Sequence, residues 1–243
     1  MVCVAPPIVM VNGIAEAIEA FSLGNPVMIF DSDFRERETD LLWPAAKATP
    51  EIMRRLRKDC GGLLFLAIGD EIGEKFGLPW LQDIHSTPSI VEDNPVLGEL
   101  ITNDLQYDSR SAFTLSLNHR ETYTGITDRD RALTTRRFGE LAGEVYELSN
   151  SEAMEALGKE FRTPGHIPLC RESPGGLSKR QGHTELAVAI ARLSGNIPCT
   201  IGAEMLDPDG DGALSLQEAR KYAEEHGIPM ITGNDIMESM DMV

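Results

Sequence analysis

Short apolar runs of strand length alternate along this chain with segments of helical periodicity. Strands are expected at 26–30, 41–46, 61–68, 112–118, 166–171, 197–203 and 229–232, and helices at 14–21, 50–59, from 70 onward, 130–143, 184–194 and 215–226. Such alternation indicates a sheet layered with helices, because each helix must bury its apolar face against another element. The residues alone leave open whether the sheet is parallel or mixed.

Two helix starts carry typical capping residues. Asn12 is placed to cap the helix that Gly24 ends, and Thr49 can cap a helix whose first residue is Pro50. Residues 79–110 carry prolines, acids and polar residues without a clear period, so we interpret them as a long excursion of the kind that often forms a lid. No repeat, low-complexity tract or linker divides the chain. We therefore expect one domain over 1–243, with 1–11 as a loosely ordered N-terminal extension.

The composition restricts the classes of partner. A chain of 243 residues with 42% hydrophobic content can bury a full core. The formal net charge of −17 argues against binding to nucleic acid or to an anionic membrane. Residues 1–11 are apolar but too short to span a bilayer, and no basic residue precedes them. The four cysteines lie far apart, which favours a reducing compartment over a disulfide framework. We expect a cytoplasmic protein.

Residues 31–40 form an acidic loop that directly follows the apolar run 26–30. This loop holds five acids and two arginines in ten residues. A strand that ends in so many carboxylates can hold a divalent cation or supply general bases. The alternative is a solvated surface, which is the more common role of such a charged run.

A second polar stretch, 180–185, precedes the predicted helix at 184–194. It contains Arg180, Gly182, His183 and Thr184. The free backbone N–H groups and the positive dipole end of a helix N-terminus favour an anion, and the guanidinium adds a cation. This stretch therefore predicts a phosphate site.

Both stretches, together with 124–131, 162–167 and Glu204, resemble 3,4-dihydroxy-2-butanone 4-phosphate synthase of riboflavin biosynthesis, most of all its archaeal stand-alone form. The resemblance runs from about residue 12 to about residue 240, with the motifs in the same order and at similar spacing. It implies conversion of the sugar phosphate D-ribulose 5-phosphate to 3,4-dihydroxy-2-butanone 4-phosphate and formate, with Mg²⁺ or Mn²⁺, in a homodimer. The implied fold class is α+β, a three-layer α-β-α sandwich with a mixed sheet.

The resemblance also implies residue roles. Glu36 and His183 match the metal ligands, and His166 and Glu204 match the two catalytic positions. The remaining matches are contacts to substrate: Arg35, Glu36, Asp40 and Glu204 for the sugar, and Thr124, Arg180, Gln181, Gly182, His183 and Thr184 for the phosphate. Two positions depart from the family pattern. Arg37 replaces a small or amide residue, and Thr39 stands where many bacterial members have glycine.

The chemistry of these residue types agrees with that reading. Forming an enediol from a ketopentose phosphate needs a base for a carbon-bound proton and an electrophile for the developing oxyanion. Glu38, Asp40, Asp31 and Asp33 remain available as bases or hydroxyl acceptors. A metal-dependent isomerase or lyase acting on another sugar phosphate would need the same parts.

One segment suggests a different class of protein. Residues 207–218 match the EF-hand calcium loop, with acids at loop positions 1, 3, 5 and 12 and glycine at position 6. A true EF-hand needs a helix leading into the loop, but Pro198 and the β-branched residues around it predict a strand there. We therefore interpret 207–218 as a strand-to-helix loop and keep a calcium-binding protein as the alternative.

Overall fold

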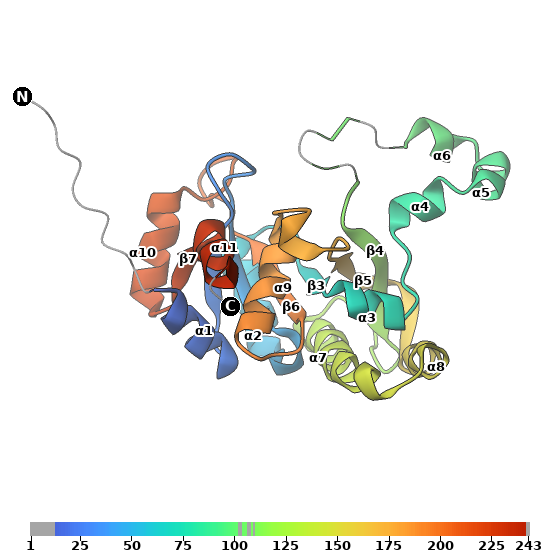
Figure 1. The fold of residues 1–243 in the computed structure, drawn as a ribbon, viewed down its shortest axis with the longest axis horizontal. Coiled ribbons are helices and arrows are strands. Elements are labelled where there is room, and N and C mark those ends of the chain that lie inside the picture. Colours follow the sequence, from blue (N-terminus) through green and yellow to red (C-terminus); the bar gives the residue numbers. More distant parts are fainter. Residues whose placement is uncertain (1–12, 102–103, 106–107, 109, 242–243) are drawn as a thin grey trace, which may run out of the picture.

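The computed structural model describes residues 13–101, 104–105, 108 and 110–241. Within them one mixed sheet contains seven strands in the order β4-β5-β3-β6-β2-β1-β7 (Figure 1). The strands are β1 (Val27–Phe30), β2 (Thr39–Pro44), β3 (Phe65–Ile68), β4 (Phe113–His119), β5 (Phe161–Arg171), β6 (Cys199–Glu204) and β7 (Met230–Thr232). Two neighbouring pairs, β1 with β7 and β3 with β5, are parallel, and the other four pairs are antiparallel.

Helices cover both faces of this sheet, which confirms the predicted α+β sandwich. On one face, α1 (Ile14–Ser22), α9 (His183–Leu193) and α11 (Gly233–Asp241) share a buried cluster with strand residues such as Ile29. On the other face, α2 (Pro50–Arg55), α7 (Asp128–Glu144), α8 (Asn150–Glu160) and α10 (Leu216–His226) contribute to a second cluster around Phe138. The strands are continuous apolar runs because successive side chains enter one cluster and then the other.

The predicted strands and the predicted helices are all present, with shifted ends. Thr49 caps α2 as predicted, since its hydroxyl accepts a hydrogen bond from the Ile52 amide. That helix continues as a π-helical turn to Cys60 and stops at Gly61, whose φ is 85°. Gly13 takes the N-cap position of α1, while Asn12 lies outside the described residues.

Apart from the short helices within 79–110, two helices were missing from the prediction. The start of α8 carries a capping box in which Ser149 and Glu152 bond to each other's backbone amides, a signal that is visible in the sequence. The helix α11 follows β7 without a connecting loop. Its start also carries a reciprocal cap, because Thr232 and Asp235 each bond to the other's backbone amide, and this Thr-x-x-Asp pattern is visible in the sequence.

The predicted excursion at 79–110 is more regular than expected. After α3 (Asp70–Lys75) it contains α4 (Leu81–His85), α5 (Pro88–Asp93) and α6 (Val96–Glu99), and no residue of these three helices is buried. In Figure 1, α4 lies beside β4, and α5 and α6 extend away from the sheet. The prediction of an irregular segment was wrong for these helices, because short solvent-exposed helices have no apolar face to produce a period.

The calcium-type loop follows β6, as the strand prediction required. Leu206 and Ala213 form an antiparallel bridge, and the Asp207 amide donates to the Gly212 carbonyl. Glu218 accepts a hydrogen bond from Ser215 at the start of α10. The segment is thus a strand-to-helix connection, and the calcium-binding alternative is not favoured.

Three chain segments meet at one edge of the sheet. The acidic loop joins β1 to β2, the N-terminus of α9 lies beside it, and the pairing of β2 with β6 sets Asp40 opposite Glu204. Within the described residues no helix has both the length and the apolar character needed to cross a membrane.

Candidate active site

The buried Asp31 side chain holds the acidic loop in shape. Its Oδ2 accepts a hydrogen bond of 2.9 Å from the Glu36 amide, and its Oδ1 accepts one of 3.0 Å from the Glu38 amide. The Asp31 amide in turn donates to the Glu38 carbonyl at 3.1 Å. Because both carboxylate oxygens bind backbone amides, Asp31 is a structural residue of the loop rather than a free base.

Arg37 lies between these two glutamates in a left-handed conformation, with φ at 60°. Small and amide residues adopt this conformation more readily than arginine, which explains the residue types expected here. The Arg37 side chain is 70% exposed and approaches Asp33 at 4.0 Å. The substitution therefore affects the turn and adds charge at the surface.

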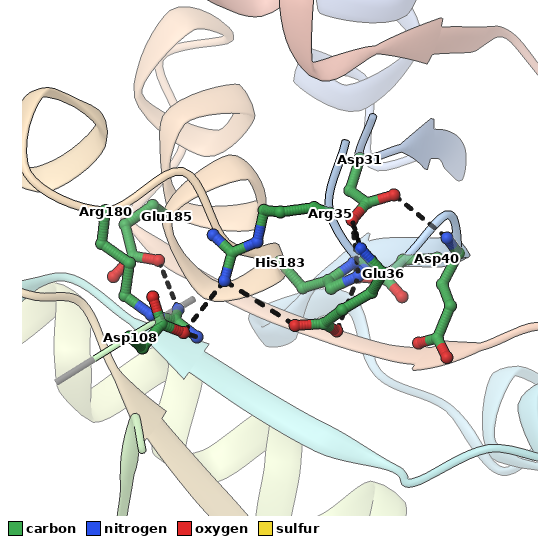
Figure 2. A network of polar contacts seen from close by, with 9 residues as sticks. Asp31, Arg35, Glu36, Asp40, Asp108, Arg180, His183 and Glu185 are labelled. Atoms are coloured by element: carbon green, nitrogen blue, oxygen red, sulfur yellow. Dashed lines mark hydrogen bonds and ion pairs between the residues drawn. The ribbon is translucent and has the colours of Figure 1, made fainter. Parts of the chain in front are cut away.

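The side chain of His183, in the first turn of α9, points at the acidic loop (Figure 2). Its Nδ1 lies 2.8 Å from Oδ2 of the buried Asp40. This contact fixes the ring so that Nε2 faces Glu36 Oε2 at 3.4 Å. The structure thus places Asp40 behind the imidazole, the arrangement in which a carboxylate orients a metal-binding histidine.

Glu36, Glu38 and His183 can each direct one donor atom to a common point, since these atoms lie within 4.8 Å of one another. His183 Nε2 is buried and has no hydrogen-bond partner among the described residues. Burial disfavours a charged imidazole, but Asp40 and Glu36 outweigh burial and raise the pKa of His183 well above its usual value. Two carboxylates and one imidazole suit Mg²⁺ and still better Mn²⁺, so this donor set fits a divalent cation.

Glu204, at the end of β6, is the carboxylate with the most altered acidity. Burial, followed by the charge of Asp40, raises the pKa of Glu204 to about 7. Gly62 packs directly against this side chain, where a Cβ atom would collide with the Glu204 carboxylate. A carboxyl group with a pKa near neutrality can both accept and return a proton at physiological pH.

Arg180 is held beside the N-terminus of α9. Its Nη1 donates to the fully buried Glu185 at 2.6 Å, and Glu185 also accepts from the Ser173 amide. The guanidinium covers Gly182, which is the N-cap residue, and any larger residue there would collide with it. The cap is not filled by a side chain. The Arg180 guanidinium and the uncapped amides at the N-terminus of α9 can therefore bind the same anion.

A second arginine from the acidic loop joins this position. Arg35 Nη2 lies 2.9 Å from Asp108 Oδ2, and Arg180 Nη2 lies 2.8 Å from the same oxygen. Figure 2 shows the Asp108 carboxylate between the two guanidinium groups. The guanidinium groups of Arg35 and Arg180 thus lie close together, although the two residues are 145 positions apart in the sequence.

These groups line one cavity of about 230 Å³. Its walls include Glu36 and His183 of the possible metal ligands and Arg180 of the anion site, together with apolar side chains from β3 and from the start of β4. The lining residues are Glu36, Leu63, Phe65, Leu105, Asp108, Ser111, Ala112, Phe113, Cys170, Arg180, His183, Thr184 and Glu204. Three of the predicted contact residues do not line the cavity but contact residues that do. Arg35 binds Asp108, Asp40 binds His183, and Gly182 packs against Arg180. The side chain of Gln181 is exposed.

Thr124 and His166 are not among the described residues that line this cavity. Both lie around Asn118 of β4, whose side chain bonds to His166 and packs on Gly125. Both are exposed, and the amide and hydroxyl of Thr124 bind Asp130. Their predicted roles stay predictions, and one protomer does not bring them into its own cavity.

Three residues of the site were not assigned from the sequence. Glu38 was considered only as a base, Glu185 was hidden among helix-forming residues, and Asp108 lies in the segment without periodicity. Glu185 carried a weak signal, because a carboxylate directly before the apolar run at 186–191 needs a partner if it is buried. Asp108 had none, since its partners are far away in sequence.

Comparisons with known proteins agree with this geometry. A model of the 3,4-dihydroxy-2-butanone 4-phosphate synthase family matches residues 15–239. Proteins of that name from Methanothermobacter thermautotrophicus and Archaeoglobus fulgidus are each 42% identical to this chain. The alignments cover 93% of this chain and 95% of the first relative, and 94% of this chain and 94% of the second.

Solved structures show the same similarity. A 3,4-dihydroxy-2-butanone 4-phosphate synthase in complex with two magnesium ions superposes with a TM-score of 0.71 at 25% identity, over 96% of this chain and 98% of the other. The enzyme of that name from Candida albicans gives a TM-score of 0.70 at 28% identity, over 95% and 98%.

Proposed function

This chain belongs to the 3,4-dihydroxy-2-butanone 4-phosphate synthase family, and we propose that it is a lyase that converts D-ribulose 5-phosphate to 3,4-dihydroxy-2-butanone 4-phosphate and formate in riboflavin biosynthesis. One observation carries the proposal. A cluster of carboxylates and an imidazole shares a cavity of about 230 Å³ with a phosphate-type anion site. A five-carbon sugar phosphate needs both sites, at its two ends.

Glu36, Glu38 and His183 would hold the divalent cation, either Mg²⁺ or Mn²⁺. When bound, the cation supplies Lewis acidity that stabilises the oxyanion of an enediol. Asp40 keeps the His183 ring oriented toward the two glutamates. The magnesium-bound relative and the donor set both support this assignment.

The chain's own residues account for phosphate binding and proton transfer. Arg180 and the first turn of α9 bind the phosphate and so fix the distance of the carbon skeleton from Glu204. Enolisation, loss of the C1 hydroxyl, the skeletal shift and release of C4 as formate all move protons. With its pKa of about 7, Glu204 can take a proton in one step and return it in another.

In a homodimer, the remaining predicted residues, Thr124 and His166, would reach the cavity of the partner protomer. Thr124 and His166 share an exposed surface around Asn118, outside the protomer's own cavity. Tyr123 and Ile126, which flank Thr124, are 95% and 53% exposed, as expected of side chains that a second protomer covers. We assign this surface to the partner's cavity.

The whole chain would act as one cytoplasmic domain. Strands from β1 to β7 belong to one sheet, which supports a single domain over 1–243. The alternative, a metal-dependent isomerase or lyase acting on another sugar phosphate, would use the same site.

Product analysis tests the proposal. Purified protein incubated with ribulose 5-phosphate and Mg²⁺ should form the four-carbon ketone phosphate, detected by mass spectrometry, and chelation should stop its formation. Glu36→Gln is the matched inactive control, since it removes one charge without changing shape. A pentose phosphate isomer as the sole product would instead support the isomerase.

A further inference from the structure

We propose that Asp108 is a specificity-determining residue that competes with anions for the two arginines of the phosphate site and must be displaced by the substrate's phosphate. This inference rests on the proposed function, because it takes Arg180 as a phosphate ligand. It adds a residue from outside both polar sequence stretches. Figure 2 shows the three side chains concerned.

The contact geometry is that of a bound oxyanion. A single carboxylate oxygen, Asp108 Oδ2, accepts from Arg35 Nη2 at 2.9 Å and from Arg180 Nη2 at 2.8 Å. The three side chains are 11 to 16% exposed, so water screens these contacts only partly. Two guanidinium groups converging on one oxygen is how proteins commonly hold phosphate.

Arg110, two residues after Asp108, is held by contacts with the body of the protein. Arg110 stacks on the Trp80 ring, with its guanidinium carbon 3.5 Å from the ring centroid. The other guanidinium near this ring belongs to the buried Arg171, which is 4.2 Å away and ion-paired with Asp70. Arg110 also reaches Asp83 at 3.3 Å. The Asp108 carboxylate itself is held by its contacts with Arg35 and Arg180.

Asp108 and Arg180 line two cavities at once. The first is the active cavity that contains Glu204. The second is an outer cavity of about 390 Å³, lined by Gln82, Asp83, Asp108, Arg110, Ser173, Lys179 and Arg180. The ion-paired carboxylate thus stands between them, where an anion that reaches Arg180 from the outer cavity would meet it.

Charge decides which anions can replace this carboxylate. A phosphate monoester carries a charge of about −1.5 to −2 at neutral pH and has three acceptor oxygens, whereas a carboxylate carries a single charge. A phosphate can therefore match both arginines and the amides of α9 together, which a monoanion cannot. Formate, the product of the proposed reaction, has the same chemistry as Asp108 and gains nothing by replacing it.

The test is calorimetric titration of inorganic phosphate into metal-free protein, so that the result does not depend on the cation. Wild type is compared with Asp108→Asn and Asp108→Ala, so that the result does not depend on one replacement. We expect both variants to bind phosphate about tenfold more tightly, the size of one lost ion pair at a binding site. The KM for ribulose 5-phosphate should fall in parallel.

Asp83→Asn is the matched control. It removes the same charge from the outer cavity, but its 58% exposed side chain contacts neither Arg35 nor Arg180 through any described ion pair. Phosphate affinity in this variant should stay near wild type. Phosphate affinity that is unchanged, weaker or absent in the Asp108 variants would overturn the proposal, because Asp108 would then support the arginines. Formate production by wild type tests the proposed function separately.

Discussion

Asp40 acts on the active cavity through a neighbouring side chain. The resemblance assigned Asp40 to the sugar, but its Oδ2 binds His183 Nδ1 at 2.8 Å and its side chain is almost fully buried. Residue type alone could not separate these two roles, because any carboxylate in the acidic loop can contact a hydroxyl. The predicted contact of Asp40 with the sugar stays a prediction, whereas its contact with His183 depends on the packing of α9 against β2, which is a long-range property.

We predict that Asp40→Asn weakens binding of Mn²⁺ about 10- to 100-fold, because an amide no longer fixes the tautomer of His183. Calorimetric titration of the metal measures this change. Asp33→Asn, at a 70% exposed position of the same loop, is the control and should bind Mn²⁺ like wild type. Equal loss of affinity in both variants would mean that only the loop's total charge matters.

Glu204 lowers the stability of the metal-free protein at neutral pH. Its pKa is about 7 in the folded state against an ordinary 4.5, so the folded state holds a proton that the unfolded state releases between these values. Stability from this group is therefore lost as pH rises from about 4.5 to about 7.

Glu204→Gln should accordingly abolish formate release while raising the free energy of unfolding at pH 8 by about 1 to 3 kcal/mol. At pH 4 the same variant should differ little from wild type. Urea unfolding at both pH values measures the difference. An equal effect at pH 4 and pH 8 would show that the substitution acts through packing rather than through charge.

At the scale of elements, helix starts and strands could be predicted from the local sequence, whereas the pairing of the strands could not. Thr49 and Pro50 placed the start of α2, and the apolar runs placed the strands, because capping and burial on both faces are local properties. The strand order was not available, since it depends on contacts between segments far apart. For the same reason the sequence did not reveal the role of Asp108, whose partners are Arg35 in the acidic loop and Arg180 before α9.

The elements on either side of the loop at 207–218 argue against the EF-hand that its sequence motif suggests. Its acids match a calcium loop, yet β6 precedes it and Ser215 caps α10 by accepting a hydrogen bond from the Glu218 amide. We predict that Asp207→Asn combined with Asp211→Asn changes formate production by less than about twofold, as expected of surface substitutions. Calorimetry with calcium should show any weak binding to wild type reduced in this variant. A folded but inactive double variant would place the loop in the active site.

At the scale of the whole molecule, the proposed active site combines residues of two protomers. The surface of Thr124 and His166 and the cavity of Glu36 and His183 belong to different parts of one chain. We predict that a mixture of Glu36→Gln and His166→Ala protomers, each inactive alone, regains about a quarter of wild-type activity after subunit exchange, because half the dimers are mixed and each has one intact site. Formate release after mixing measures this recovery. Two variants that stay inactive when mixed, although mass spectrometry shows exchange, would place His166 in its own protomer's site.

The central claim is that the site removes C4 of ribulose 5-phosphate as formate. The most direct measurement follows ribulose 5-phosphate labelled with ¹³C at C4, incubated with the purified protein and Mg²⁺ and observed by ¹³C NMR. The account predicts that the label appears in formate and that an unlabelled four-carbon ketone phosphate accumulates. Label retained in a five-carbon phosphate, or formate that carries carbon from C1, would contradict it.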